Sequence, residues 1–439
     1  MRSGLYALLA LPACYAPSIV SGVTCEPSTA SCPAGQTCQP SGDGYACLAG
    51  DAGIEPDGGV DSPPPPPDAS VCLGNHLLGS VCLARAPTAA VTLSGTTPIN
   101  SANVAPGGCT EIQPQPGGPS LCIIAGTTIT IPAAVTLRVF AVNPAGTAAA
   151  GTNPIVLFAT QSIAIQGTLD VASHVGEVIA SMPVLGAGSR SAIGCAAINL
   201  DGTQGRPAGQ NIAFGGGGAA GGSLGSLGGA GGSGGNGNQV AHGNPVAGTI
   251  PALLAGGCPG GNGGNGDGTG GGGGIGGGGG GAVYLIAGDS ITIAGKINAS
   301  GAGGGKGTAG MFSSGGGGGG GSGGMIVLEA PSIVVPATGT LFANGGGGAS
   351  GSGGNDNDTG TSGSDPSAAT TAAAGGPGND GGGGGGNGSL GAAPAAAGKN
   401  GSGQFTEAAG GGGGGGAGVI RVFGVPPSSV TGAISPPPT

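Results

Sequence analysis

Uninterrupted glycine runs constrain the fold of this chain more than any other feature of its sequence. Glycine brings no side chain to a hydrophobic core, and it loses more backbone entropy on ordering than any other residue. With 113 glycines and 35 prolines among 439 residues, the composition is of the low-complexity kind, and one large globular core is not expected. The runs include residues 215–218, 270–274, 276–281, 315–321, 381–386 and 410–416.

The chain carries very little charge. Only 6% of its residues are charged, the formal net charge is −10, and there are nine Lys and Arg residues in all. Ordinary disordered chains are rich in charge, so this is not a disordered segment of the usual kind. So few cations also form no basic face, which argues against nucleic acid as a partner.

A short unit recurs between the glycine runs. Each copy has three segments with an apolar residue at every second position, which is the period of a β-strand and not of a helix. One copy has too few aliphatic side chains to fold alone, so we expect the copies to stack and join their small cores. The copies are 155–171, 283–299 and 326–343, with a degraded copy at 420–434 and a partial one at 129–139.

This triplet pattern resembles the strand repeat of bacterial autotransporter passengers and of pectin-lyase-like proteins. The resemblance implies an all-β fold with a parallel β-helix-like repeat. From the glycine content we add long glycine-rich insert loops and partial disorder to this expectation. The alternative is that the same strands form antiparallel hairpins in a sandwich.

Glycine-rich inserts separate the copies, at 174–281, 301–324 and 345–418. None interrupts an apolar alternation, so we interpret them as loops that leave one edge of the stack. In composition and spacing they resemble the repeats of PGRS-type surface proteins. Two physical states remain open: flexible coil, or extended three-fold helices whose backbones pack side by side and form hydrogen bonds with each other.

The first residues of the sequence, 1–14, resemble the signal segment of a bacterial lipoprotein. After a short apolar stretch, Leu11-Pro12-Ala13-Cys14 is similar to a lipobox. This resemblance implies that Cys14 is lipidated and that the lipid anchors the protein to a membrane. We therefore expect a location in the cell envelope or outside the cell, as an outer-membrane lipoprotein. Another exported form and an unprocessed N-terminus are the alternatives.

Three further regions follow the signal segment. Residues 15–48 form a small Cys-rich module, for which a zinc site is the rival interpretation, although no Cys-x2-Cys pair and no His is present there. Residues 49–70 form a linker in which acidic residues surround five prolines, a composition that favours extended polyproline II. Residues 71–439 form the repeat domain.

Eleven cysteines fit an oxidising compartment. Without Cys14 an even number remains, so all of the others can pair. We expect the neighbours in sequence to form loop-closing disulfides, and a bridge within the first insert to shorten it. The candidate disulfide cysteines are Cys25, Cys32, Cys38, Cys47, Cys72, Cys82, Cys109, Cys122, Cys195 and Cys258, with Cys72–Cys82, Cys109–Cys122 and Cys195–Cys258 as hypothetical pairs.

The search for chemistry finds no catalytic set, and no cofactor is predicted. Glycine motifs for nucleotides require a following amphipathic helix, which no run has. Asp356 and Asp358 are weak calcium candidates, with a solvated loop tip as the alternative. Asp170 and Lys296 occupy similar positions in two copies, so we expect either a salt bridge across neighbouring coils or plain surface, and not a catalytic pair.

The sequence thus predicts a non-enzymatic surface protein of the cell envelope, structural or adhesive in role. Surface glycans and other envelope proteins are the partners we would expect besides the membrane. The alternatives are a carbohydrate-binding or polysaccharide-degrading β-helix protein and a disordered component of the extracellular matrix.

Overall fold

The computed structural model divides the chain into two units, Met1–Pro65 and Pro66–Thr439, which are considered separately. The boundary falls within the proline run of the predicted linker. The residues described are 36–41, 44–49, 70–95, 98–102, 108–142, 153–179, 182–191, 195, 200–204, 215–235, 240–266, 271–310, 313–354, 358–402 and 407–439.

The first unit contains an antiparallel pair of strands, β1 (Gln36–Ser41) and β2 (Gly44–Ala49). Their register places the backbone of Cys38 opposite that of Cys47, and Cys38 is disulfide-bonded. Cys14, Cys25 and Cys32 lie outside the described residues, as does most of the predicted linker.

The second unit contains a nine-stranded sheet that is mostly parallel. Its main path runs β20-β15-β10-β14-β19-β22, and β8 pairs with β10 and also carries β5 and β7. The strands are β5 (Val91–Thr92), β7 (Glu111–Gln113), β8 (Leu121–Ile131), β10 (Ile155–Ile165), β14 (Ala282–Ala287), β15 (Ser290–Ile293), β19 (Met325–Glu329), β20 (Ser332–Val334) and β22 (Val419–Phe423).

An eight-stranded sheet follows the order β12-β13-β9-β11-β16-β21-β23, with β6 paired to β9. Two short hairpins, β3–β4 and β17–β18, and the 3-10 helix η2 (Pro427–Ser429) complete the unit. The remaining strands are β3 (Val71–Leu73), β4 (Val81–Leu83), β6 (Ile99–Asn100), β9 (Thr136–Val142), β11 (Thr168–Asp170), β12 (Val178–Ile179), β13 (Met182–Gly186), β16 (Lys296–Asn298), β17 (Ala309–Gly310), β18 (Ser313–Ser314), β21 (Thr340–Phe342) and β23 (Ala433–Ser435).

Matching strands of different copies pair in parallel. In the larger sheet Ile155 aligns with Val283, which aligns with Ile326 and then Ile420. In the smaller sheet Leu169 aligns with Ile297, Leu341 and Ile434 in the same way. Equivalent side chains therefore lie above one another although their positions in the sequence are far apart.

The predicted parallel β-helix is nevertheless wrong for this unit. The sheets are mixed, because β7 pairs antiparallel with β8, β13 with β9, and β12 with β13. Among the described residues between β13 and β14 no named strand is present, so the strand copies do not follow one another as continuous coils. A large share of the unit consists of glycine-rich segments outside the two sheets.

The aliphatic core lies between the two sheets and on the outer face of the larger one. In β10, Ile155 and Leu157 belong to the cluster between the sheets, while Val156 and Phe158 belong to the cluster on the other face. All four are 0% exposed. Burying one such side chain contributes about 1.5–3 kcal/mol, so alternation along the strand fills both cores.

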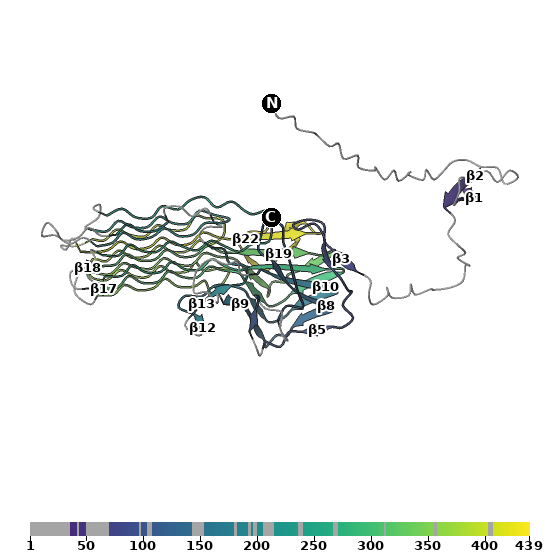
Figure 1. Ribbon diagram of the computed structural model, residues 1–439, viewed down its shortest axis with the longest axis horizontal. Helices are drawn as coiled ribbons and strands as arrows, with labels where there is room; N and C mark the ends of the chain where they lie inside the picture. Colours follow the sequence, from purple (N-terminus) through teal and green to yellow (C-terminus); the bar gives the residue numbers. More distant parts are fainter. Residues whose placement is uncertain are drawn as a thin grey trace, which may run out of the picture. The chain divides into compact units, whose positions relative to one another are not determined.

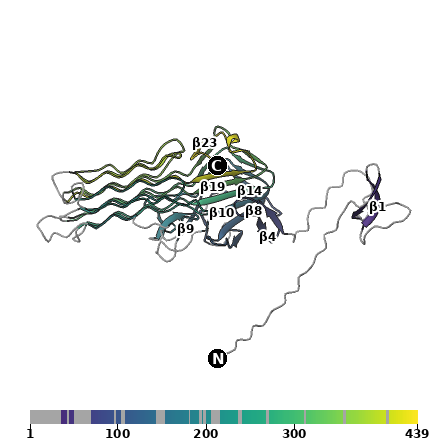
Figure 2. The ribbon, with the colours of Figure 1, turned by 90° about the horizontal axis from the view of Figure 1, so that it is seen from above.

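The glycine-rich segments extend away from the strands as a layered array. Figure 1 shows them side by side to the left of the sheets, and Figure 2 shows the same arrangement from above. Most of the glycines in the described parts of the inserts are buried. The expectation of long loops with partial disorder is therefore wrong for these parts, which are extended and packed together.

Candidate functional site

The glycine run 315–321 forms backbone hydrogen bonds with a period of three residues. Successive N–H groups donate in turn to three neighbouring segments, at N to O distances of 2.8–3.0 Å. A period of three is that of an extended three-fold helix and not of a β-strand. The donor and acceptor pairs are Gly315 to Thr308, Gly316 to Gly264, Gly317 to Gly410, Gly318 to Gly305, Gly319 to Gly261, Gly320 to Gly413 and Gly321 to Ala302.

The carbonyl groups of this run accept hydrogen bonds from three further segments, again in rotation. The run therefore has six neighbours, and each of its backbone donors and acceptors has a partner, as buried peptide groups require. The pairs are Ser352 to Gly315, Gly274 to Gly316, Ala219 to Gly317, Ala349 to Gly318, Gly277 to Gly319, Gly222 to Gly320 and Gly346 to Gly321.

The six neighbours leave no room for side chains. A Cβ atom built at any position of 315–321 would overlap a backbone carbonyl oxygen of an adjacent segment. The same is true throughout the run 410–416. Glycine is therefore required here by the close approach of the backbones, and not by left-handed backbone conformation.

In the segment 271–281, at the edge of the array, the positions with room for a side chain lie three residues apart. Ile275 interrupts the glycines of 271–281 and is 76% exposed. Three residues earlier, a Cβ at Gly272 would meet only the Thr308 hydroxyl, at 3.0 Å. At Gly273 and Gly274 it would overlap backbone oxygens. Side chains thus occur where the three-fold backbone faces solvent.

A charged cluster joins the strands to the third insert. His174 Nε2 lies 3.0 Å from Asp170 Oδ2, and its Nδ1 lies 3.2 Å from Asp365 Oδ2. Arg138, on β9, lies 3.7 Å from Asp170 and 2.6 Å from Glu177. The chain has few charged residues, and this cluster brings several of them from distant parts of the sequence into contact.

Asp365 also fixes backbone groups on both sides of this cluster. Its carboxylate accepts hydrogen bonds from the N–H of Val175, at 3.1 Å, and from the N–H of Gly303, at 2.8 Å. The third insert is thereby fastened to the turn after β11 and to the segment that follows β16.

The cluster shifts the protonation of its members. Hydrogen bonds to Asp170 and then to Asp365 raise the pKa of His174 to about 9, so the imidazole is charged at neutral pH. Burial opposes ionisation of Asp170, but the hydrogen bond with His174 and the charge of Arg138 outweigh it and lower the pKa of that carboxyl. The charges therefore stabilise each other.

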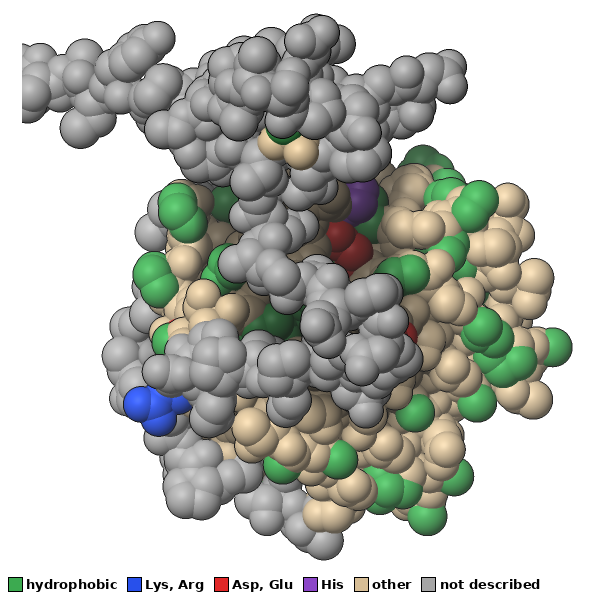
Figure 3. Space-filling view, turned by 90° about the vertical axis from the view of Figure 1, so that its right-hand side faces the viewer, with side chains coloured by type: hydrophobic (Ala, Val, Ile, Leu, Met, Phe, Trp, Pro, Cys, Tyr) green, Lys and Arg blue, Asp and Glu red, His purple; other side chains and the backbone are tan. Residues whose placement is uncertain are grey.

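A second cluster, around Glu329 at the end of β19, holds the β3–β4 hairpin. Its carboxylate accepts hydrogen bonds from the hydroxyl of Tyr284 and from the N–H of Asn75, and it lies 2.7 Å from His76 Nδ1. His76 stacks on Phe423 of β22, with 4.7 Å between the ring centroids. Figure 3 shows histidine and acidic side chains beside each other on an otherwise mostly uncharged face.

Burial, and then the Glu329 carboxylate, raise the pKa of Tyr284. The phenol therefore stays protonated and donates to Glu329. Gly74 has a φ of +79°, and a Cβ there would lie 2.6 Å from Ile286 Cδ1. The hairpin turn thus needs glycine both for its backbone conformation and for its approach to the sheet.

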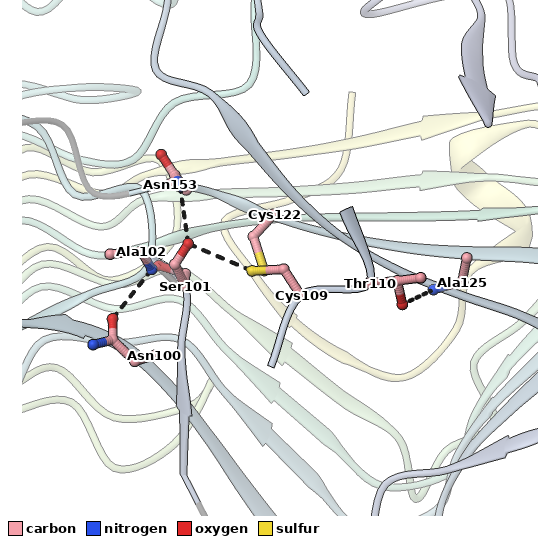
Figure 4. The surroundings of a disulfide bond; sticks show 8 residues. All are labelled: Asn100, Ser101, Ala102, Cys109, Thr110, Cys122, Ala125 and Asn153. Carbon is pink, nitrogen blue, oxygen red and sulfur yellow. Dashed lines mark hydrogen bonds between the residues drawn. A yellow bond between two sulfur atoms is a disulfide. The ribbon is translucent and has the colours of Figure 1, made fainter. Parts of the chain in front are cut away.

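Three disulfides close loops in the second unit: Cys72–Cys82, Cys109–Cys122 and Cys195–Cys258. These are the pairs that the sequence analysis put forward. Figure 4 shows that Cys109 Sγ lies close to the carbonyl oxygen of Ser101, at 3.5 Å, and that Asn153 donates to the same oxygen at 2.9 Å. This disulfide therefore sits within a local polar network.

The expected salt bridge between Asp170 and Lys296 is wrong. The register places Lys296 beside Thr168, and Asp170 beside Arg138 and Asn298. Asp170 accordingly interacts with Arg138 and His174, while the Lys296 ammonium lies 5.7 Å from the centre of the Phe342 ring. A shift of two residues along a strand moves a side chain by about 7 Å, enough to separate the pair.

Of the weak calcium candidates, Asp356 lies outside the described residues. The backbone carbonyl of Asp358 accepts a hydrogen bond from Gly353 N–H, at 3.1 Å. Within the described ranges, no group of three or more His, Cys, Asp and Glu side chains is arranged to hold a metal ion.

Sequence reasoning missed both charged clusters. Asp365 lies 191 residues from His174, and Glu329 lies 253 residues from His76. The only signal in the sequence was the scarcity of charge, which makes each charged residue in an apolar or glycine-rich setting a candidate for pairing.

Comparisons with protein families, with curated protein sequences and with solved structures gave no match to this chain. In the part of the chain that is described, we find no helix with the length and hydropathy of a membrane span.

Proposed function

We propose that this protein is a non-enzymatic structural element of the bacterial cell surface, in which the glycine-rich array forms a stiff body. The observation that carries the proposal is the six-neighbour hydrogen-bonding of the run 315–321. An array held by its own backbone bonds, with few charges and few exposed large side chains, is suited to bearing load or presenting surface.

The two charged clusters support a structural role. In each, histidine and carboxylate groups are occupied with one another and with backbone N–H groups. His174 and Asp365 fasten an insert, and Glu329 fastens a hairpin. These internal contacts suit groups that hold a fold together.

We further propose that Cys14 carries a lipid anchor and that residues 49–70 act as a spacer to an outer membrane. Polyproline II spans about 3.1 Å per residue and resists compression better than a glycine linker. Such a spacer would hold the array away from the membrane surface.

Anchoring and exposure can be tested in a bacterial host that processes lipoproteins. Palmitate labelling should occur in the wild type and disappear in Cys14→Ser; equal labelling would reject the anchor. Ile275→Cys, at an exposed site, should react with a membrane-impermeant maleimide on intact cells. Leu285→Cys, at a site that is 0% exposed, is the matched control and should react only after unfolding.

The rigidity of the array can be tested on the purified full chain by hydrogen exchange. Buried, hydrogen-bonded amides exchange only when the structure opens, whereas those of flexible coil exchange freely. We expect strong protection of the amides in 315–321 and 410–416. Exchange of these amides at the rate of free peptides would contradict the structural role.

A further inference from the structure

Arg190 lies beside the Cys195–Cys258 disulfide. Its Nη2 donates a hydrogen bond to Cys258 Sγ, at 2.9 Å, and its backbone N–H donates to the carbonyl oxygen of Gly257, at 3.1 Å. Its Nε is buried without a hydrogen-bond partner. Among the residues that the structure describes, no carboxylate forms a salt bridge with Arg190.

The guanidinium of Arg190 is partly shielded from water and contacts a neutral sulfur. Arg190 is partly buried, and desolvation lowers its pKa, because a cation that loses water without gaining an anion is destabilised. The sulfur of a disulfide is a weak, neutral acceptor. A thiolate at Cys258 would supply the missing negative charge at the same position.

The two cysteines of this disulfide differ in exposure. Cys258 is 3% exposed, and its backbone is fixed on both sides by Ser322. Cys195 is partly exposed. This difference favours attack by a solvent thiol on Cys195, in which case the leaving sulfur is the one beside Arg190.

We propose that the Cys195–Cys258 disulfide is a thiol-exchange site whose substrate is a small thiol or dithiol reductant, with Cys195 as the attacked sulfur and Cys258 as the leaving sulfur. The site would make the closure of the first glycine-rich insert sensitive to the redox state of its surroundings.

The exchange proceeds in two balanced steps. The thiolate of the reductant bonds to Cys195 Sγ, the bond between Cys195 and Cys258 breaks, and the electron pair leaves on Cys258 as a thiolate beside Arg190. A second thiolate, from the same dithiol or a second thiol, attacks the reductant's sulfur and releases Cys195. The reductant is oxidised to a disulfide, Cys195 takes up a proton, and Cys258 remains a thiolate.

Arg190 accelerates the first step because a better-stabilised thiolate is a better leaving group. A neighbouring cation favours the thiolate form of cysteine. Reduction also removes a covalent closure across 63 residues of sequence, which increases the freedom of the first insert.

The other disulfides provide references within the same molecule. Cys72 and Cys82 are both exposed, and Cys109 and Cys122 are both buried. In the described residues neither pair has an arginine hydrogen-bonded to sulfur. The rate at which Cys72–Cys82 is reduced therefore measures the reaction of an exposed disulfide with the reductant. Reduction of Cys109–Cys122 indicates that the fold has opened.

The test treats the full oxidised chain with limiting glutathione and measures the reduction of each disulfide by alkylation and peptide mapping. In the wild type, the trapped glutathione adduct should lie on Cys195. Arg190→Gln should slow reduction of Cys195–Cys258 about ten-fold and leave the rate at Cys72–Cys82 unchanged. Arg190→Lys, which keeps the cation, should restore most of the rate.

A second readout is the thiol pKa of Cys258 in the reduced protein, followed by the ultraviolet absorbance of its thiolate against pH. It should rise in Arg190→Gln. An adduct on Cys258, or equal exchange rates in the wild type and Arg190→Gln, would overturn the proposal. If Arg190→Gln also exposed Cys109–Cys122 to reduction, comparison with Arg190→Lys would decide, since only the loss of charge should slow exchange at Cys195.

Discussion

The strands and the glycine-rich array of the second unit are both tightly packed, but they pack in opposite ways. The strands bury aliphatic side chains at every second position, as in β10, where both faces are covered. The array buries backbone, and the run 315–321 packs against six neighbours with no side chain at all. The strands are stabilised by contacts between side chains, whereas the array is stabilised by contacts between backbones that only glycine permits.

This difference sets opposite rules for substitution. A hydrophobic core is damaged by removing atoms, because a cavity remains. The glycine array is damaged by adding atoms, because the backbones are already in contact. The predictions below run from the largest expected effect to the smallest.

The largest effect is expected for Gly320→Val in the interior of the array. The added side chain would overlap the carbonyl oxygen of Gly346, so the adjacent segments must separate and lose hydrogen bonds. We expect a loss of more than about 4 kcal/mol in the free energy of unfolding, measured by urea denaturation. A loss below about 1 kcal/mol would show that the interior is not close-packed.

Leu285→Ala should have the next largest effect, through the opposite mechanism. Leu285 is 0% exposed and lies in the core between the sheets. The cavity should reduce the free energy of unfolding by about 3 kcal/mol. Hydrogen exchange should show the loss of protection first in β14 and its neighbours; a loss that began in the run 315–321 would contradict the separation of the two regions.

Asp365→Asn should have a smaller effect, because it weakens only the junction where Asp365 of the third insert binds His174. The strand cores and the interior of the array stay intact. The variant loses charge-assisted hydrogen bonds to His174 and to two backbone N–H groups. We expect a loss of about 1–2 kcal/mol by urea denaturation. Asp289→Asn, at an exposed site, is the control and should change stability by less than about 0.5 kcal/mol.

The same junction should depend on pH. The pKa of His174 is raised from 6.5 to about 9 in the folded state, so its contribution is fully present below 6.5 and is lost as the pH rises to 9. The lowered pKa of Asp170 gives a contribution that is present above 3.8 and lost in acid. The urea midpoint should therefore fall from pH 6.5 to 9 in the wild type and change less in His174→Gln. Parallel pH profiles would remove His174 as the cause.

Gly272→Ala should have the smallest effect, and it is the matched control for the array. A Cβ there meets only the flexible hydroxyl of Thr308, at 3.0 Å. We expect a change within about 0.5 kcal/mol, whereas Gly273→Ala, one residue later, should be strongly destabilising. Equal effects at the two positions would mean that the three-fold phase does not control where side chains fit.

The strand segments were accessible to sequence reasoning because their period of two is local. The copies at 155–171, 283–299 and 326–343 correspond to strands that align in parallel. The β-helix prediction failed because antiparallel partners such as β7 and β13 come from segments without a clear period. The charged clusters were inaccessible because residues such as Asp365 and His174 meet only through the docking of an insert.

The sequence by itself determined which residues carry side chains into a core and where the glycine-rich segments lie, because an apolar period of two residues and a glycine run are both local patterns. It left open whether the glycine segments are coil or packed helices. Only the tertiary structure decided that, because each extended segment has no internal hydrogen bonds and becomes ordered only when neighbours from distant parts of the chain supply partners for every peptide group.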